Sequence, residues 1–351
     1  MFRRNVAVKR TVLFAAAAVA VTALTACGDS PAAQQASSGS AGSSGSPTSV
    51  TVTLNFLAGA PNSGFILAKE KGYYAEQGLD VKVQEGQGSN STASLVAGGK
   101  SEFGYADGPS AITVASKGGA LVNIGPILQT NGFSVMSLKK SGIASIKDLQ
   151  GKSVALQPGT AQASLFDAVL AAADVPKSSV DIVNLDPSAL VASLIQGKVD
   201  AITAGADNQA VQLRDQGADI NEVLYRDAGV PTIGLSMIAS STYAEQNPEV
   251  VKKFVAASLK GWSYAVQHQD ETADVVAKAF PQGADAKAIK EQFAVDAQLI
   301  CPSADSKVGG TPESNWTATY DLMVKYLALP TDKPITDYYT NDYLPAELPA
   351  C

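Results

Sequence analysis

The first fifty residues of this chain constrain most strongly what the rest can fold into, because they separate a leader from a folded remainder. Four basic residues lie within positions 3–10, and an almost unbroken apolar run follows at 12–23. That run is too short for a comfortable membrane span, which needs about twenty residues. A basic head, a short apolar run and small residues at 24–26 are typical of an export signal. Residues 1–26 are therefore predicted to be a signal peptide.

The end of this segment, Leu24-Thr25-Ala26-Cys27, resembles the lipobox of bacterial lipoproteins, in which the cysteine is lipidated and becomes the first residue. The following stretch, 28–49, is rich in Ser, Gly and Ala, and such low-complexity segments act as flexible spacers. One acyl chain binds membranes only marginally, and the resemblance implies several, palmitate included. The alternative is an ordinary cysteine beside a cleavage site. We expect a lipid anchor on Cys27, a tether at 27–49 and a location on the extracytoplasmic face of the cell membrane.

The remaining residues, Val50 to Cys351, are too many for one typical core and fit two lobes. Four of the 26 basic residues lie in the leader, which leaves 22 basic residues against 33 acidic ones. The folded part shows no basic stripe, so nucleic acid is not an expected partner. These counts give the part after the leader a net charge of about −11.

Two cysteines remain after Cys27, namely Cys301 and Cys351. An even pair outside the cytoplasm is most simply a disulfide. It would close a loop of about fifty residues, for which loop-entropy arguments give about 4 kcal/mol of stabilisation. Two free thiols are the alternative. Metal binding is disfavoured because the chain has no Cys-x-x-Cys and only one histidine.

Strand-like and helix-like segments alternate after residue 50. Strands are predicted at 50–56, 79–83, 102–105, 121–127, 134–138, 153–156, 180–185, 199–203 and 233–239. Helices are predicted at 65–76, about 90–97, from 108, 161–173, 188–196, 209–216, 248–268 and 271–279. This βαβαβ rhythm predicts an α/β fold of mostly parallel sheets covered by helices.

Residues 68–81, AKEKGYYAEQGLDV, resemble the AKEKGYFxxxGLDV signature of one solute-binding family, which serves bacterial ABC importers of sulfonates, nitrate and thiamine pyrimidine precursors. Further matches follow in chain order at 95–99, 148–152, 197–201, 247–254 and 339–344. The matching segments are mostly scaffold, so they specify the family and leave the ligand open.

The resemblance implies a two-lobed, periplasmic-binding-protein-like fold of type 2 with a two-stranded hinge. On that pattern lobe one comprises 50–130 and 240–351, and lobe two comprises 131–239. The chain is expected to cross between the lobes near 129–130 and again near 233–234.

Ligands of open parallel sheets collect beyond the carboxyl ends of the strands, where helix N-termini point. The loops predicted at those ends are rich in Gly, Ser, Thr, Asn, Gln and Asp. Capping and turning are the alternative roles of every such residue. The predicted ligand-binding residues are Asn55, Phe56, Asn62, Ser89, Asn90, Asp107, Ser110, Thr160, Gln162, Asp207 and Asn208.

The side chains in these loops favour one class of ligand. None is Lys or Arg, so an anionic ligand would depend on helix N-termini alone. Asp107 and Asp207 could each place a carboxylate in the cleft, and a buried carboxylate needs a donor or a cation. Phe56 could stack on a flat ring. We therefore favour a small, flat, amine-bearing ligand, of which a thiamine precursor is one example in the family, and keep a sulfonate as the alternative.

An enzyme is the strongest competing class, because a eukaryotic branch of the family makes the thiamine pyrimidine from its own histidine. His268 is the only histidine here, and its place near the end of the predicted helix 248–268 favours a structural role. A structural surface lipoprotein is a third class. The resemblance implies instead a monomeric, cofactor-free binding protein that is not an enzyme. Such a protein closes its hinge on a solute and delivers it to a membrane permease and its ATPase.

Overall fold

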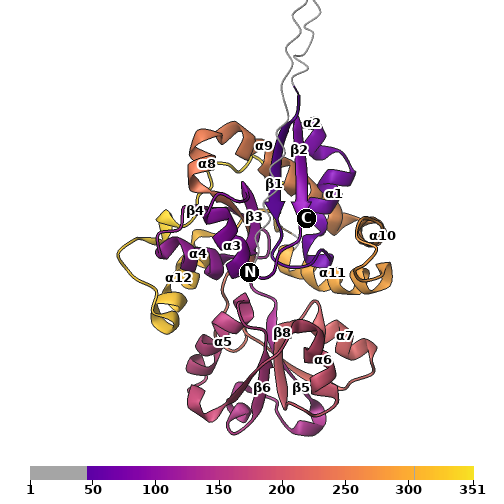
Figure 1. Cartoon of the computed structure of the whole chain (residues 1–351), viewed down its shortest axis with the longest axis vertical. Coiled ribbons are helices and arrows are strands. Elements are labelled where there is room, and N and C mark those ends of the chain that lie inside the picture. The colour runs from indigo at the N-terminus through magenta and orange to yellow at the C-terminus, as the bar shows by residue number, and fades with distance from the viewer. Residues whose placement is uncertain (1–45, 304) are drawn as a thin grey trace, which may run out of the picture. The chain divides into compact units, whose positions relative to one another are not determined.

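The computed structural model describes residues 46–303 and 305–351, so the predicted signal peptide, Cys27 and the tether up to residue 45 lie outside the described residues. Two five-stranded sheets organise the described part (Figure 1). The first contains β1 (Thr48–Thr53), β2 (Leu79–Gln84), β3 (Phe103–Asp107), β4 (Leu121–Pro126) and β10 (Leu235–Ser240). The second contains β5 (Phe133–Leu138), β6 (Ser153–Leu156), β7 (Asp181–Asn184), β8 (Ala201–Gly205) and β9 (Ile220–Leu224).

The strand order is β2-β1-β3-β10-β4 in the first sheet and β7-β6-β8-β5-β9 in the second. In the first sheet β1 runs parallel to β2 and β3, and β10 is antiparallel to both of its neighbours. The second sheet repeats this pattern, with β5 as the reversed strand. Each reversed strand is the first one formed after the chain passes from one sheet to the other. The predicted α/β fold with mostly parallel strands is confirmed.

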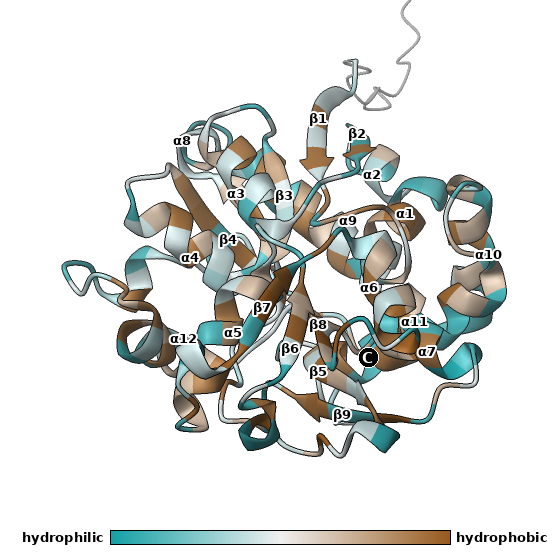
Figure 2. Ribbon diagram, turned by 60° about the horizontal axis from the view of Figure 1, so that its bottom comes forward, coloured by the Kyte–Doolittle hydropathy of each residue, from teal (hydrophilic) through white to brown (hydrophobic). Residues whose placement is uncertain are grey.

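Helices cover both sheets, and each sheet with its helices is called a lobe below. Lobe one carries α1 (Ser63–Glu70), α2 (Tyr73–Glu76), α3 (Ser89–Ala97), α4 (Gly108–Ser116), α8 (Ser241–Gln246), α9 (Pro248–Gln267), α10 (Gln269–Ala279), α11 (Ala286–Ile300) and α12 (Glu313–Leu327). Lobe two carries α5 (Ala161–Ala172), α6 (Pro187–Ile195) and α7 (Gln209–Asp215). Figure 2 shows hydrophobic colour concentrated on the strands, while the surrounding helices alternate, as amphipathic covering helices do.

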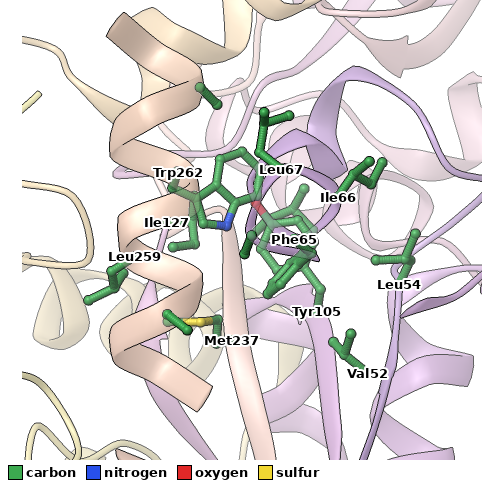
Figure 3. Packing of buried hydrophobic residues seen from close by; sticks show 14 of the residues in the cluster. Val52, Leu54, Phe65, Ile66, Leu67, Tyr105, Ile127, Met237, Leu259 and Trp262 are labelled. Atoms are coloured by element: carbon green, nitrogen blue, oxygen red, sulfur yellow. The ribbon is translucent and has the colours of Figure 1, made fainter. Parts of the chain in front are cut away.

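The core of lobe one is built around close contact between α1 and α9 (Figure 3). A Cβ at Gly64 would overlap the ring of Trp262, and a Cβ at Gly261 would overlap the Gly64 carbonyl, so both positions require glycine for this approach. Phe65 packs edge-on against Trp262, with ring centroids 5.7 Å apart, and against Tyr105 at 5.0 Å. This packing fixes the start of α1 directly behind the loop that follows β1.

Two segments that cross between the lobes hydrogen-bond to each other. The Leu128 N–H donates to the Leu235 carbonyl at 3.0 Å, and the Asn131 N–H donates to the Thr232 carbonyl at 2.9 Å. The Asn131 side chain adds a 2.9 Å bond to the Val230 carbonyl. A paired connection of this kind can bend while it resists separation of its two strands, which is the geometry of a hinge.

The structure differs from the predicted elements in four places. The helix predicted at 65–76 is divided into α1 and α2, because Gly72 adopts a positive φ of 77° between them. β9 and α8 were not predicted. β10 pairs with β3 and β4, so residues 235–239 extend the first sheet, although the expected boundary placed them in lobe two.

The C-terminal end of the chain is tied to the end of α11. Cys301 follows the last residue of α11 and forms a disulfide with Cys351, with the two Cα atoms 5.9 Å apart. The Val308 N–H donates to the Pro349 carbonyl at 3.0 Å beside it. Within the part of the chain that the structure describes, no helix combines the length and apolar character that a membrane span requires.

Candidate functional site

A cavity of about 280 Å³ lies between the two lobes. Its walls come from the loops that follow β1, β2 and β3 in lobe one and β6, β7 and β8 in lobe two. These are carboxyl ends of parallel strands, where the N-termini of α3, α5, α6 and α7 converge. The topology thus brings segments more than a hundred residues apart in sequence to one site.

Nine of the eleven predicted ligand-binding residues line this cavity. They are Asn55, Phe56, Asn62, Ser89, Asp107, Thr160, Gln162, Asp207 and Asn208. Asn90 and Ser110 do not line it: Asn90 hydrogen-bonds across the lobes to Ser164, and Ser110 is buried within α4. Ligand contact by the nine residues stays a prediction.

Asp107 is the last residue of β3 and lies buried at the base of the cavity. The Ser89 hydroxyl donates to its Oδ2 at 2.8 Å, so the start of α3 holds the carboxyl in place. Burial raises the pKa of Asp107 to about 7, the Ser89 hydrogen bond opposes this, and the negative charge of Asp207 adds to it. Near neutral pH this carboxyl is therefore divided between its neutral and ionised forms.

Asp207 faces the same cavity from lobe two, in the loop between β8 and α7. Burial raises the pKa of Asp207 to about 6, hydrogen bonds from the backbone at 207 and 208 oppose the rise, and the charge of Glu222 adds to it. Carboxyls on the two lobes therefore act on each other through the cavity. A positive charge or a set of N–H donors between them would relieve that repulsion.

A third carboxyl, on Asp296, was missed from the sequence. Asp296 lies on α11 with Gln292 one turn earlier, and both side chains line the cavity although each is almost fully buried. They interrupt the apolar positions Ile289, Phe293 and Ile300 of the same helix. Two polar residues four apart on a buried helix face were the available signal. This signal was overlooked because the predicted site residues were taken only from loops at the ends of strands, and α11 follows a helix.

Several polar loop residues are already used within the loops. The Asn62 amide donates to Asn55 Oδ1 at 2.8 Å, which fixes the loop after β1. The Thr160 hydroxyl caps α5 by accepting from the Ala163 N–H at 3.4 Å, and donates to the Gln157 carbonyl at 2.7 Å. These capping roles, the alternative considered for such residues, coexist with a place in the cavity wall. They hold the wall in a fixed shape before any ligand arrives.

The lobes touch on both flanks of the cavity. On one flank Gly88 lies against Gly159, and the Asn90 amide donates to the Ser164 hydroxyl at 3.2 Å. On the other flank Lys287 of α11 forms a 3.7 Å ion pair with Asp215 of α7. The cavity is therefore bounded by both lobes and by the contacts between them.

The cavity wall has one apolar side and no basic group. Phe56 lies within it, and Leu57 at its rim has 60% of its surface exposed. None of the described residues that line the cavity is Lys, Arg or His. His268 follows the last residue of α9 and packs against Tyr264, with the ring centroids 4.1 Å apart and the rings tilted by 30°. It is not part of the cavity wall.

Comparison with known proteins identifies the family of this chain. Residues 61–272 match the family described as "NMT1/THI5 like". The chain belongs to the NMT1/THI5-like family. The resemblance expected from the sequence is thus confirmed over more than half of the chain.

Three similar proteins illustrate this family and fold. The chain is 25% identical to the riboflavin-binding protein RibY of Chloroflexus aurantiacus over 84% of this chain and 86% of that protein. It is 27% identical to the formylaminopyrimidine-binding protein of Halalkalibacterium halodurans, over 65% and 69% of the two chains. The periplasmic aliphatic sulphonate binding protein SsuA of Escherichia coli superposes with a TM-score of 0.67 at 19% identity, over 86% of this chain and 100% of that one. The last similarity shows the periplasmic-binding-protein fold.

An enzyme also occurs among the relatives of this NMT1/THI5-like chain. The 4-amino-5-hydroxymethyl-2-methylpyrimidine phosphate synthase of Legionella pneumophila is 23% identical over 66% of this chain and 74% of that protein. The relatives of this chain therefore include binding proteins and a synthase, and the similarity alone does not decide between them.

Proposed function

We propose that this protein captures a small, flat, amine-bearing organic solute between its lobes and delivers it to an ABC importer. The observation that carries the proposal is the cavity itself. Both lobes line the cavity, and three aspartates face it. None of the described residues that line the cavity has a basic side chain. A solute with N–H donors satisfies those carboxyls, and Phe56 offers a ring face for a flat body.

Capture would proceed by closure of the two lobes about a hinge that is formed by the paired segments 127–132 and 230–235. A ligand that contacts both lobes binds the closed form better than the open form and so shifts the population toward closure. A change from mostly open to mostly closed requires about 5.5 kcal/mol of differential binding. The fixed polar walls on both lobes are suited to provide it.

Delivery would take place at the membrane, and the leader supports this part of the proposal. A lipid on Cys27 and the tether at 27–49 would hold the domain at the extracytoplasmic face, within reach of a permease and its ATPase. The two lobes would present adjoining faces to the permease when closed. We infer that the protein acts in this role as a monomer.

A sulfonate is the second candidate, and one specific observation favours it. The N-termini of α3 and α5 reach the cavity wall at Ser89 and Ala161, and helix N-termini attract anions. The three aspartates oppose an anion in the same space. A pyrimidine synthase of the same fold is the third candidate, and the exclusion of His268 from the cavity wall argues against histidine chemistry there.

The experiment is a ligand screen read by thermal shift and by small-angle X-ray scattering on the chain that begins at residue 28. The panel contains aminopyrimidines, riboflavin, alkanesulfonates and primary amines. An amine-bearing compound should raise the melting temperature and contract the radius of gyration. Contraction only with alkanesulfonates would favour the second candidate, and turnover of a compound by the purified protein would favour an enzyme.

A further inference from the structure

Asp296 is a buried carboxyl that its own lobe leaves unsatisfied. Its side chain is 1% exposed and lines the cavity, and its Oδ2 has no hydrogen-bond partner among the described residues. Burial of a polar atom without a partner is costly and uncommon in native proteins. Because Asp296 lines the cavity, a partner for this oxygen has to come from what occupies the cavity, either water or a ligand.

The group that acts most directly on Asp296 belongs to the opposite lobe. Burial, followed by the charge of Asp207, raises the pKa of Asp296 well above its ordinary value. The charge of Asp296 in turn raises the pKa of Tyr105, which lies on β3 beneath the cavity and also responds to Asp107 and Asp207. Glu222 on β9 adds negative charge near Asp207. Each of these neighbouring titratable groups is acidic.

The same two elements already touch outside the cavity, since Lys287 of α11 and Asp215 of α7 form their ion pair on the outer surface. Asp296 of α11 and Asp207, two residues before α7, therefore lie on facing elements of the two lobes. In the closed arrangement two like groups are brought together with no counter-charge between them. Keeping both carboxyls ionised, or protonating one of them, costs free energy, and separation of the lobes or a bridging donor relieves that cost.

We propose that Asp296 and Asp207 form a carboxyl pair across the cleft, and that a nitrogen group of the solute with a positive charge or at least two N–H donors bridges them and couples its recognition to closure. This inference rests on the proposed function, which is capture of a solute between the lobes. It adds that Asp296 of α11 helps to select the solute. Within the described residues no set of three His, Cys, Asp or Glu side chains has the grouping of a metal site. The proposal therefore commits to an organic bridging group, and Mg²⁺ is the alternative that the test includes.

A carboxyl pair of this kind would distinguish two solutes that differ only in one ring substituent, an amino group or an oxo group. An amino group presents N–H donors to both carboxyls, whereas an oxo group at the same ring position presents an acceptor to them. A binding site discriminates strongly against an analogue that leaves its buried polar groups without hydrogen-bond partners. We expect the amino compound to bind at least about tenfold more tightly than its oxo counterpart, because a buried pair leaves unpaired groups when one partner is removed.

The test uses the chain from residue 28 and two probes of equal size, 4-amino-2-methylpyrimidine and 4-hydroxy-2-methylpyrimidine, with methanesulfonate and Mg²⁺ as further probes. The variants are Asp296→Asn, Asp207→Asn and the double substitution. Glu291→Gln is the matched control, since it also removes a carboxylate from α11. The Glu291 carboxylate lies at the surface, 3.1 Å from Lys287 Nζ. Affinity is measured by calorimetry and closure by small-angle X-ray scattering.

The proposal expects the amino probe to bind and contract the wild-type chain, with affinity reduced about tenfold or more by Asp296→Asn and by Asp207→Asn, and unchanged by Glu291→Gln. The double variant should lose less than the sum of the single losses, because both act on one bridged group. Asp296→Asn should also raise the melting temperature of the ligand-free chain at pH 8, since it removes an unpaired buried carboxyl.

Two results overturn this inference and leave solute capture standing. One is binding of the amino probe with an affinity that Asp296→Asn does not change. The other is contraction with methanesulfonate, Mg²⁺ or the oxo probe alone. If no probe contracts the wild-type chain, and the wider panel of aminopyrimidines, riboflavin, alkanesulfonates and amines does not either, the proposed function fails together with the inference.

Discussion

Gly88 of lobe one lies directly against the backbone of Gly159 of lobe two: a Cβ at Gly88 would meet the Gly159 carbonyl oxygen at 3.0 Å. Gly88 has φ = 119°, a conformation that L side chains rarely adopt, and its N–H donates to the Asn55 carbonyl at 2.7 Å. The loop before α3 thus contributes to the cavity wall and to the contact between the lobes. A side chain at this point would force the two loops apart by a few tenths of an ångström where the lobes meet.

We predict that Gly88→Ala weakens ligand binding by keeping the lobes apart. The control is Gly99→Ala, where φ is 64° and a Cβ would meet nothing within 4 Å. Both substitutions carry backbone strain of roughly 1–3 kcal/mol, so both should lower the melting temperature. Only Gly88→Ala should also enlarge the radius of gyration in the presence of a ligand. An equal ligand-induced contraction in the two variants would contradict a role for this contact in closure.

A second prediction concerns pH and the buried carboxyl of Asp107. Its pKa of about 7 in the folded chain exceeds the model-peptide value of 3.8, so the folded state holds this proton more strongly than the unfolded state. Its contribution to stability is therefore fully present below about pH 4 and is lost as the pH rises through 7. At 1.36 kcal/mol per pKa unit the loss is at most about 4 kcal/mol.

The pKa of Asp207, raised to about 6, acts in the same direction, and its contribution is lost as the pH rises through 6. Urea unfolding between pH 4 and pH 8 should therefore show the free energy of unfolding falling with pH. Asp107→Asn should flatten that dependence, while Asp80→Asn, at an exposed position of β2, should leave it unchanged. A slope unaltered by Asp107→Asn would mean that this carboxyl is solvated.

The fold was predictable from the sequence where periodicity is strong. Strands such as 153–156 and helices such as 248–267 carry runs of apolar residues with clear spacing and end at Gly, Pro or Asn signals. β9 was missed because it is an edge strand: its residues INEVL are all half-buried and polar at two of five positions. α8 has only six residues, too few for a helical pattern to be seen.

The site was predictable in its loops and not in its helix wall. Residues at strand ends, such as Asp107 and Asp207, could be placed because the topology of a parallel sheet fixes where strand ends meet. Asp296 was not placed: its spacing from Gln292 indicates two polar residues on a buried helix face, but only tertiary packing brings that face of α11 to the cavity. The sequence also could not distinguish Asn90, which joins the lobes, from Asn55, which lines the cavity.

A third prediction concerns the disulfide between Cys301 and Cys351, which ties the end of α11 to the end of the chain. Intact mass with and without reductant should differ by two hydrogens. Replacement of both cysteines by serine should cost about 4 kcal/mol or less, since the bridge closes a loop of 50 residues. Affinity should fall as well, because Asp296 and Leu299 of α11 line the cavity. Equal masses before and after reduction would exclude the bridge.

The last prediction concerns Cys27, which lies outside the described residues. Lipidation there requires its thiol, so Cys27→Ser should move the protein from the detergent phase to the aqueous phase on phase separation of cells. The double replacement of Cys301 and Cys351 by serine is the control: it removes two thiols and should leave the protein in the detergent phase. An uncleaved leader would also keep the protein in the detergent phase. Mass spectrometry of the N-terminal peptide distinguishes this case from acylation of Cys27. Because two or more acyl chains are needed for stable anchoring, the wild-type peptide should carry more than one. An unacylated Cys27 on a chain that still partitions with membranes would show that another segment anchors it.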